Sequence, residues 1–274
     1  MNSITRFFFY SNFFISLCAF ALTLGIFCFE EVTFILLIPN AIFSFLSVFA
    51  FYNFQRLFLF QYYKERQETG IFIWLKSNRL ILIFFIALVF CLLLPLCLAV
   101  ILDNLFLLIL IAFFSVLYFF PLFPIRNFIF IKPFYVSFFW VIICIVIPWK
   151  YMGLGNTLSL ILLSIAQFIF IASLCIQFDV RDMKLDLSKG VKTLPMVLGI
   201  KNAKLFSAGM MLVYSVIMVK LNLHFFVPVL LTLVLSVALI FLNHTERKQY
   251  HYLFLLDGCI LFQVILFLLW KNFM

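Results

Sequence analysis

Three aspartates near residue 180 are the side chains whose type and spacing point most directly to chemistry. Asp179, Asp182 and Asp186 follow one another at intervals of three and four residues, which predicts that they share one face of a helix. Carboxylates on one helix face repel each other, so this arrangement does not stabilise the helix by itself. A divalent cation with a phosphate behind it would turn the repulsion into ligation. Lys189 and Lys192 follow directly and are placed to hold the same anion.

The elements that carry these residues are predicted to be membrane-spanning helices. The chain has 274 residues, of which 67% are hydrophobic and 11% are charged, a composition typical of integral membrane proteins. Nine apolar runs each approach the length of about 20 residues that a bilayer requires. They cover roughly residues 7–28, 32–54, 80–102, 104–121, 133–149, 157–178, 204–220, 224–243 and 252–270. We therefore predict an all-α membrane protein of nine transmembrane helices, in a single domain comprising residues 1–274.

The basic residues predict how the chain is oriented. With the N-terminus in the cytoplasm, all of the 19 basic residues except Lys150, Lys220 and Lys271 fall on the cytoplasmic side, as the positive-inside rule requires. The expected location is the inner, cytoplasmic membrane of the cell. This bias, together with anionic lipid headgroups, accounts for the net charge of +9, so the charge does not indicate nucleic acid as a partner.

Two polar segments, at about residues 55–79 and 179–203, are predicted to be the main cytoplasmic loops. They follow the second and sixth apolar runs, so they lie on the same side of the membrane and can close over a cavity between helices. Ionisable side chains that line a membrane cavity indicate a functional site. For the first segment alone, a solvated loop rich in basic residues explains the pattern equally well.

The segment from Asp179 to Gly199 reads Asp-x-Arg-Asp-x-x-x-Asp-x-x-x-Gly-x-x-Thr-Leu-Pro-x-x-Leu-Gly. It resembles the second aspartate-rich motif of the UbiA family of intramembrane prenyltransferases, in which this motif ends the sixth of nine usual spans. The resemblance implies a helical bundle around a cytoplasm-facing cavity. It also implies transfer of a polyprenyl group from its diphosphate to an acceptor, which the sequence does not identify.

The resemblance further implies roles for individual residues. Asp182 and Asp186 would be the catalytic residues and, with Asp179 as a third candidate ligand, would bind Mg²⁺, while Lys189 and Lys192 would hold the diphosphate. Metal and lysines would neutralise the leaving diphosphate as its carbon–oxygen bond breaks. Aromatic faces would stabilise the allylic cation left behind. The implied partners are a polyprenyl diphosphate, an acceptor and the lipid bilayer.

The first aspartate-rich motif of that family, Asn-x-x-x-Asp-x-x-x-Asp at the end of the second span, is incomplete in this chain. Asn53 is present and is a candidate to bind the substrate, but Leu57 and Gln61 stand at the two aspartate positions. A second magnesium ion would therefore have no carboxylate ligand on this helix. Arg56 can be interpreted in two ways. Its guanidinium replaces part of the missing metal charge at the diphosphate, or its side chain extends to the cytoplasmic headgroups.

Asp257 and Arg126 complete the candidate binding residues. Asp257 lies inside the ninth apolar run, where a lone carboxylate is costly and is expected to face the bundle and find a partner such as Arg56 or Lys192. It either orients the cations at the diphosphate or forms a structural contact between helices. Arg126 belongs to the turn after the fourth run, with Tyr118 and Lys132 nearby; family members often carry aromatic and basic residues there, and anchoring at the membrane interface explains all three equally well.

Three functions are compatible with these features to different degrees. The first is a magnesium-assisted, UbiA-like prenyltransferase. The second is a non-catalytic relative that binds an isoprenoid diphosphate or another lipid, which is consistent with the incomplete first motif. The third is a transporter, which the scarcity of charge within the apolar runs and the absence of a sequence repeat disfavour.

Overall fold

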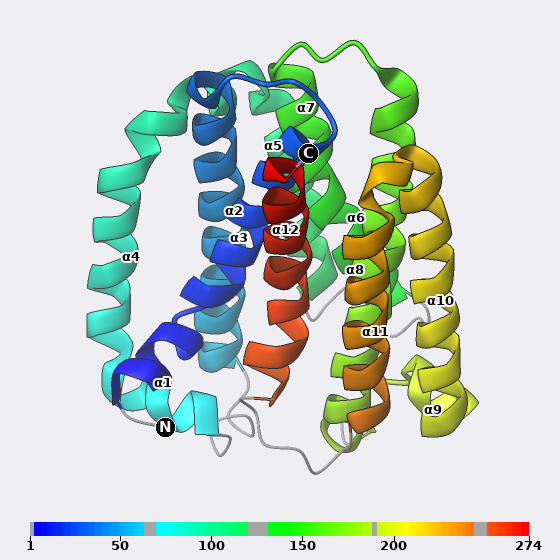
Figure 1. Ribbon diagram of the computed structural model, residues 1–274. Helices are drawn as coiled ribbons and strands as arrows, with labels where there is room; N and C mark the ends of the chain where they lie inside the picture. Colours follow the sequence, from blue (N-terminus) through cyan, green and yellow to red (C-terminus); the bar gives the residue numbers. More distant parts are fainter. Residues whose placement is uncertain (1–2, 63–69, 120–130, 188–190, 244–250, 274) are drawn as a thin grey trace.

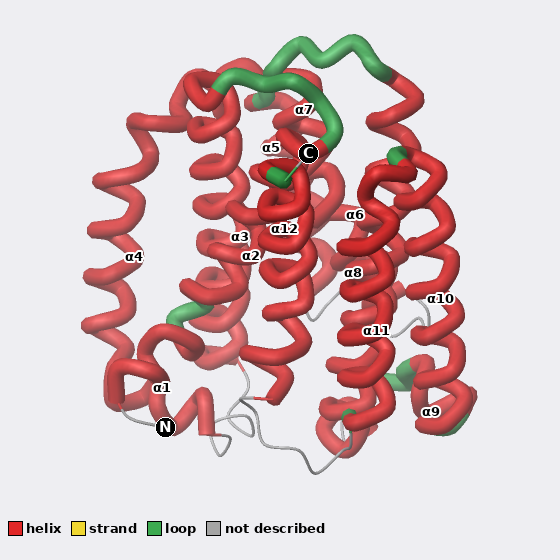
Figure 2. Tube along the Cα trace, viewed as in Figure 1, coloured by secondary structure: helices red, strands yellow, loops and turns green. Residues whose placement is uncertain are grey.

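The protein is an all-helical bundle in the residues that the structure describes. The computed structural model describes residues 3–62, 70–119, 131–187, 191–243 and 251–273. Figure 1 shows long, roughly parallel helices, and Figure 2 shows helices joined by short loops, with no strand in these ranges. A helix forms all its backbone hydrogen bonds within itself, which is why an apolar chain of this kind folds as helices in hydrocarbon.

The elements follow one another without long connections in the described ranges. In chain order they are α1 (Ser3–Tyr10), α2 (Phe13–Leu24), η1 (Gly25–Cys28), α3 (Phe34–Tyr62), α4 (Gly70–Asp103), α5 (Leu105–Phe119), α6 (Ile131–Val141), η4 (Ile142–Val146), α7 (Ile147–Tyr151), α8 (Thr157–Leu187), α9 (Leu194–Leu198), α10 (Ile200–Leu221), η5 (Leu223–Phe225), α11 (Phe226–Leu242), η6 (His251–Leu256) and α12 (Asp257–Asn272). The segments η4 and η6 are π-helical, so α6–η4–α7 and η6–α12 each continue as one helical rod.

The prediction of an all-α, multi-pass membrane protein is confirmed, whereas the count of nine spans is not. Seven helices of the described chain are long and apolar enough to cross a bilayer, and the bent pair Ile4–Tyr10 and Phe13–Cys28 makes an eighth if it is one span. The pair is bent by 59°. The remaining predicted span corresponds to Leu105–Tyr118, an apolar helix below the usual spanning length.

Where the structure describes them, the two predicted cytoplasmic loops are largely helical, which corrects that expectation. Residues 55–62 continue α3, residues 70–79 begin α4 and residues 179–187 continue α8. Loss of hydropathy marks where a chain leaves the hydrocarbon, but Gln, Arg and Lys are good helix formers and the backbone bonds continue past that point. The polar side chains are therefore held on rigid helix ends, which positions them better than loops would.

Residues 191–199, the described end of the Asp179–Gly199 segment, lead through the short helix α9 into α10. Thr193 is extended, Pro195 stands in the first turn of the short helix α9, and Gly199 has a φ of 78° between α9 and α10. Proline lacks the N–H that the first turn of a helix leaves unpaired, and glycine adopts positive φ without steric cost. This part of the motif thus specifies the connection rather than chemistry.

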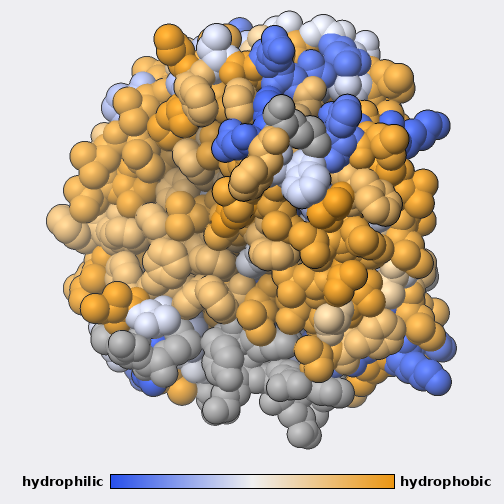
Figure 3. Space-filling view, in the orientation of Figure 1, coloured by the Kyte–Doolittle hydropathy of each residue, from blue (hydrophilic) through white to orange (hydrophobic). Residues whose placement is uncertain are grey.

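The bundle has an apolar belt and two more polar ends. Figure 3 shows hydrophobic side chains around the middle of the face in view and hydrophilic ones gathered towards its top and bottom. Within the bundle, α8 packs most extensively against α10 and α6, and α2 packs against α3 and α12. The start of α4, the ends of α3 and α8, and α9 lie at the same end as the N-terminus, opposite the C-terminus (Figure 1). The polar residues of the first and second motifs therefore meet at one end of the bundle.

Candidate functional site

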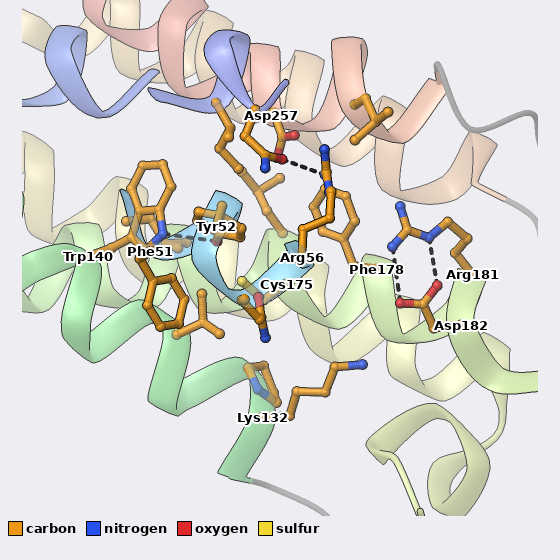
Figure 4. A pocket seen from close by; sticks show the side chains of 18 of the residues that line it. Phe51, Tyr52, Arg56, Lys132, Trp140, Cys175, Phe178, Arg181, Asp182 and Asp257 are labelled. Atoms are coloured by element: carbon orange, nitrogen blue, oxygen red, sulfur yellow. Dashed lines mark hydrogen bonds and ion pairs between the residues drawn. The ribbon is translucent and has the colours of Figure 1, made fainter. Parts of the chain in front are cut away.

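A cavity of about 520 Å³ opens between the helices at the end of the bundle where α3 and α8 carry their polar residues. Its wall is mostly aromatic and aliphatic on one side and charged on the other. Figure 4 shows Phe51, Tyr52 and Trp140 together on one side of the view, and Arg181 with Asp182 on the other. An apolar pocket with a few convergent polar groups is the usual form of a small-molecule site.

Lys132 connects two of the three motif aspartates. It lies at the start of α6, and its Nζ is 2.5 Å from Oδ1 of Asp179 and 3.0 Å from Oδ2 of Asp186, both on α8. The side chain of Lys132 is 17% exposed, whereas each carboxylate is 1% exposed. In this low-dielectric environment, opposite charges at such distances attract far more strongly than they would in water.

Asp182 belongs to a different contact. Its two carboxylate oxygens accept hydrogen bonds from Nε and a terminal nitrogen of Arg181 at 2.8 and 3.0 Å. The guanidinium also lies 5.1 Å from the ring centroids of Phe178 and Tyr252, a distance at which cation–π attraction contributes. Arg181 is thus held on three sides at the rim of the cavity.

Helix geometry explains why the three aspartates divide into two groups. An α-helix turns by about 100° per residue, so seven residues bring Asp186 back to within about 20° of Asp179. Asp182, three residues after Asp179, is displaced by about 60°. The sequence prediction of one shared face thus describes Asp179 and Asp186, which point at Lys132, better than it describes Asp182, which is partly exposed.

Asn53 and Arg56, the polar residues of the incomplete first motif, contact the break between α1 and α2. The side-chain amide of Asn53 donates to the Ser11 and Phe49 carbonyls and accepts from Asn12 Nδ2.

The Arg56 guanidinium donates to the Tyr10 carbonyl and to Oδ1 of Asn12. Asn12 has a φ of 61°, a backbone conformation that asparagine tolerates better than most residues. The cavity also borders Arg56, so this residue both secures the helix break and faces the site.

Asp257 is buried at the start of α12 and lines the cavity. Neither Arg56 nor Lys192, the partners predicted from the sequence, forms an ion pair with it within the described part of the chain. The Cys18 thiol donates to the main-chain oxygen of Asp257, which ties α2 to the start of α12. The carboxylate is therefore a polar group held inside a mostly apolar cavity, where it can meet a ligand.

The remaining predicted binding residues lie away from this cavity or outside the described residues. Lys192 is exposed beyond the end of α8 and does not line the cavity. Arg126 and Lys189 lie outside the described residues, as does the side chain of Gln61. Leu57, at the first aspartate position of the first motif, is part of α3 and offers only hydrocarbon. The binding roles of these residues stay predictions.

The arrangement of the described residues does not fit a magnesium ion. No group of three His, Cys, Asp or Glu side chains is close enough together to hold a metal within the described ranges. Lys132 already stands between Asp179 and Asp186, and Asp182 pairs with Arg181. One oxygen, Oδ2 of Asp179, is buried without a hydrogen-bond donor, but a single carboxylate oxygen is a poor site for Mg²⁺, which needs near-octahedral oxygen coordination.

Several residues of this site were not among those predicted from the sequence. Lys132 and Arg181 form the ion pairs with the motif aspartates, and Asn12 joins Arg56 to Asn53. Arg181 stands between two of the predicted aspartates, and its position alone is a usable signal. Tyr52 and Trp140, whose hydroxyl and indole nitrogen are 3.3 Å apart, carry no signal in a chain that is 20% aromatic.

Comparison with known proteins agrees with this architecture. The model of the UbiA prenyltransferase family matches residues 75–255, while no curated protein matches the chain. A solved structure described as a UbiA homolog from Aeropyrum pernix K1 is 13% identical, with a TM-score of 0.66, and the match covers 95% of this chain and 98% of that one. A structure of a digeranylgeranylglyceryl phosphate synthase is 15% identical, with a TM-score of 0.58 and full coverage of both chains. At such identity the two structures show a shared fold.

Proposed function

The chain belongs to the UbiA prenyltransferase family, and we propose that it transfers a polyprenyl group from its diphosphate to an acceptor inside the membrane. In this proposal the diphosphate lies at the charged end of the cavity and the isoprenoid chain lies along its aromatic wall. One observation carries the assignment: a single cavity joins Arg56, Lys132 and Arg181 to an apolar interior open between helices. A polyprenyl diphosphate has the same division into an anionic head and a long apolar tail.

The cations would act on the leaving group. As the bond between the first prenyl carbon and the diphosphate oxygen breaks, its electron pair stays on that oxygen and the negative charge there grows. Lys132 and Arg181 are preorganised by their carboxylate contacts, so they meet that charge without a change of position. Such fixed charges act most strongly where water is excluded.

The interior would act on the carbon skeleton and on the acceptor. The aromatic faces of Tyr52 and Trp140 border the cavity and would stabilise the positive charge on the allylic carbon. The acceptor atom then forms its bond to that carbon and loses a proton. Asp257, a buried carboxylate of the cavity wall, would receive this proton or bind the acceptor group that carries it.

The test is release of diphosphate together with formation of a prenylated product. The purified chain in nanodiscs is incubated with radiolabelled geranylgeranyl or farnesyl diphosphate and an extract of membrane lipids and quinone precursors. The expected result is a labelled product and an equal amount of diphosphate, both lost in Arg181→Met. Product formation unchanged in Arg181→Met would contradict this use of the cavity.

A second candidate function is binding of an isoprenoid diphosphate without turnover. The observation that favours it is the pairing of the motif aspartates with cations of the chain itself, together with Leu57 in place of a carboxylate. Saturable binding of the labelled diphosphate without release of diphosphate, under all acceptor conditions, would support this function over the first.

The proposal also places the site towards the cytoplasm, with the N-terminus on that side of the inner membrane. It rests on the clustering of the basic residues at one side of the predicted spans. Cysteine-accessibility labelling tests it in intact cells, after the exposed Cys91 and the other native cysteines are replaced by serine or alanine. A cysteine introduced at position 192 should react only with a membrane-permeant maleimide, and one introduced at position 271 should react with an impermeant reagent.

A further inference from the structure

The contact between Lys132, Asp179 and Asp186 joins a lysine to two of the aspartates that the resemblance assigns to a metal site. The Lys132 ammonium lies 2.5 and 3.0 Å from one oxygen of each carboxylate, and both carboxylates are buried. A buried carboxylate pair without a counter-ion is strongly unfavourable. In this chain the counter-ion is a side chain.

The part of the cavity wall that α3 forms offers no carboxylate among the described residues. On α3, Leu57 occupies the first aspartate position of the incomplete motif, and the neighbouring polar side chains bond to the α1–α2 break. The positive charge at this wall comes from Arg56. A guanidinium can hold phosphate oxygens by paired hydrogen bonds without a metal.

A divalent ion added to the carboxylate pair would have to displace Lys132 or lie beside it. Displacement moves an ammonium from two carboxylates into an apolar cavity, which is costly. Coexistence places two cations in contact at low dielectric. Both costs oppose binding of the ion, whereas removal of the lysine charge would leave two carboxylates that share one helix face and can both ligate.

We propose that Lys132 is a built-in counter-ion that takes the place of a divalent cation between Asp179 and Asp186, and that the chain binds its diphosphate ligand without a divalent metal. The second half of this statement rests on the proposed function; the first half does not. The proposal has a distinctive consequence, because removal of one lysine charge should create a metal site.

The first experiment uses the metal alone. Mn²⁺ is titrated into the full chain in nanodiscs and free Mn²⁺ is measured by electron paramagnetic resonance. Wild type and Lys132→Arg should show no saturable binding, whereas Lys132→Met should bind Mn²⁺ saturably, with an affinity at least about tenfold above the upper limit found for wild type, because the ammonium between Asp179 and Asp186 is gone. Adding Asp186→Asn to Lys132→Met should abolish the gain.

Lys204→Met is the matched control for this titration. Lys204 is also a buried lysine, but its Nζ donates to the main-chain oxygen of Phe241. Its replacement should leave Mn²⁺ binding as in wild type. Equal gains in Lys132→Met and Lys204→Met would overturn the proposal, because they would report a general loss of positive charge.

Folding of the variant does not limit the test. If Lys132→Met does not purify as a monodisperse protein, wild type and Asp186→Asn decide: saturable Mn²⁺ binding to wild type that Asp186→Asn removes overturns the proposal, and its absence in both supports it.

The second experiment measures binding of farnesyl thiodiphosphate, a slowly reacting analogue, in EDTA and in excess Mg²⁺. The wild-type affinity should agree within about threefold between the two conditions, and Lys132→Met should bind the analogue only with Mg²⁺. A wild-type affinity more than about tenfold higher with Mg²⁺ would show that the metal enters with the diphosphate, and the proposal fails. If the analogue binds under neither condition, the proposed function fails, and the Mn²⁺ titration alone decides on Lys132.

Discussion

The polar ends of α3 and α8 lie at the same end of the bundle but serve different purposes. On α8, Asp179 and Asp186 project towards another helix and hold Lys132 at the cavity. On α3, Asn53 and Arg56 bind main-chain carbonyls and the Asn12 side chain at the break between α1 and α2. A sequence motif at the end of a span thus does not reveal whether its polar groups face a ligand or the protein's own backbone. The partners that the fold brings to them decide.

This comparison predicts that variants of the contact between α8 and Lys132 chiefly change ligand binding, whereas variants at the α3 end chiefly change stability. The largest effect is expected for Lys132→Met. The variant lacks the ammonium that lies between two buried carboxylates next to the proposed diphosphate site. The affinity for farnesyl thiodiphosphate in EDTA should therefore fall by about hundredfold. Lys132→Arg should retain most of the affinity because the cation remains. Equal losses in the two variants would show that the site requires the shape of lysine rather than its charge.

Arg56→Met is expected to have the largest effect on stability. It removes charged hydrogen bonds to the Tyr10 carbonyl and Asn12, each contributing about 1.5–3 kcal/mol. The unfolding midpoint in detergent, followed by thiol reactivity of the buried Cys18, should fall by several degrees. Arg79→Met is the control, since no hydrogen bond or ion pair is described for Arg79 in the structure. If the two variants unfold alike, Arg56 does not secure the break.

Variants of Asn12 test the same helix break more specifically, and their expected effect on stability is smaller. Asn12→Gly keeps the positive φ of 61° but loses the side-chain bonds to Asn53 and Arg56. Asn12→Ala loses those bonds and adds strain, so it should be less stable than Asn12→Gly by about 1 kcal/mol. The difference in unfolding free energy between the two variants measures the backbone contribution alone. A more stable alanine variant would contradict the left-handed conformation of residue 12.

The smallest effect is expected at the aromatic wall. Tyr52→Phe removes the hydroxyl that contacts the Trp140 indole nitrogen at 3.3 Å but keeps the ring. The affinity for farnesyl thiodiphosphate should change by no more than about threefold, because the ring and not the hydroxyl is proposed to contact the isoprenoid chain. Tyr52→Ala, which removes the ring, should weaken binding more. A large loss in Tyr52→Phe would place a polar part of the ligand at this wall.

The helical nature of the bundle could be predicted from the sequence with little ambiguity. Long apolar runs in a membrane have only one way to satisfy their backbone groups, and the second motif marked the end of α8 where polar chemistry lies. The count of spans was less certain, because α1 and α2 form a bent pair and α5 is short. A hydropathy pattern predicts where apolar residues are long enough to span the membrane. It predicts neither the 59° bend between α1 and α2 nor a helix that continues beyond the hydrocarbon.

The candidate site was predicted only in part. Asp179, Asp182 and Asp186 were recognised because three like charges on one helix end are unusual in so apolar a chain. Lys132, more than forty residues earlier, has the sequence context of an ordinary basic residue at the membrane interface, and nothing in that context predicts its contacts. The same holds for Asn12, whose role depends on a residue of another helix.

The sequence by itself determined that this protein lies in a lipid bilayer, that it is helical, and which helix end carries the three aspartates. These features follow from composition and from the periodicity of one helix. Only the tertiary structure decided which charges meet. It paired Asp179 and Asp186 with Lys132 and Asp182 with Arg181, and it brought Asn53 and Arg56 into contact with Asn12 and the main chain beside it. Pairing between helices depends on their rotation and packing, and these are set by many weak contacts along the whole bundle.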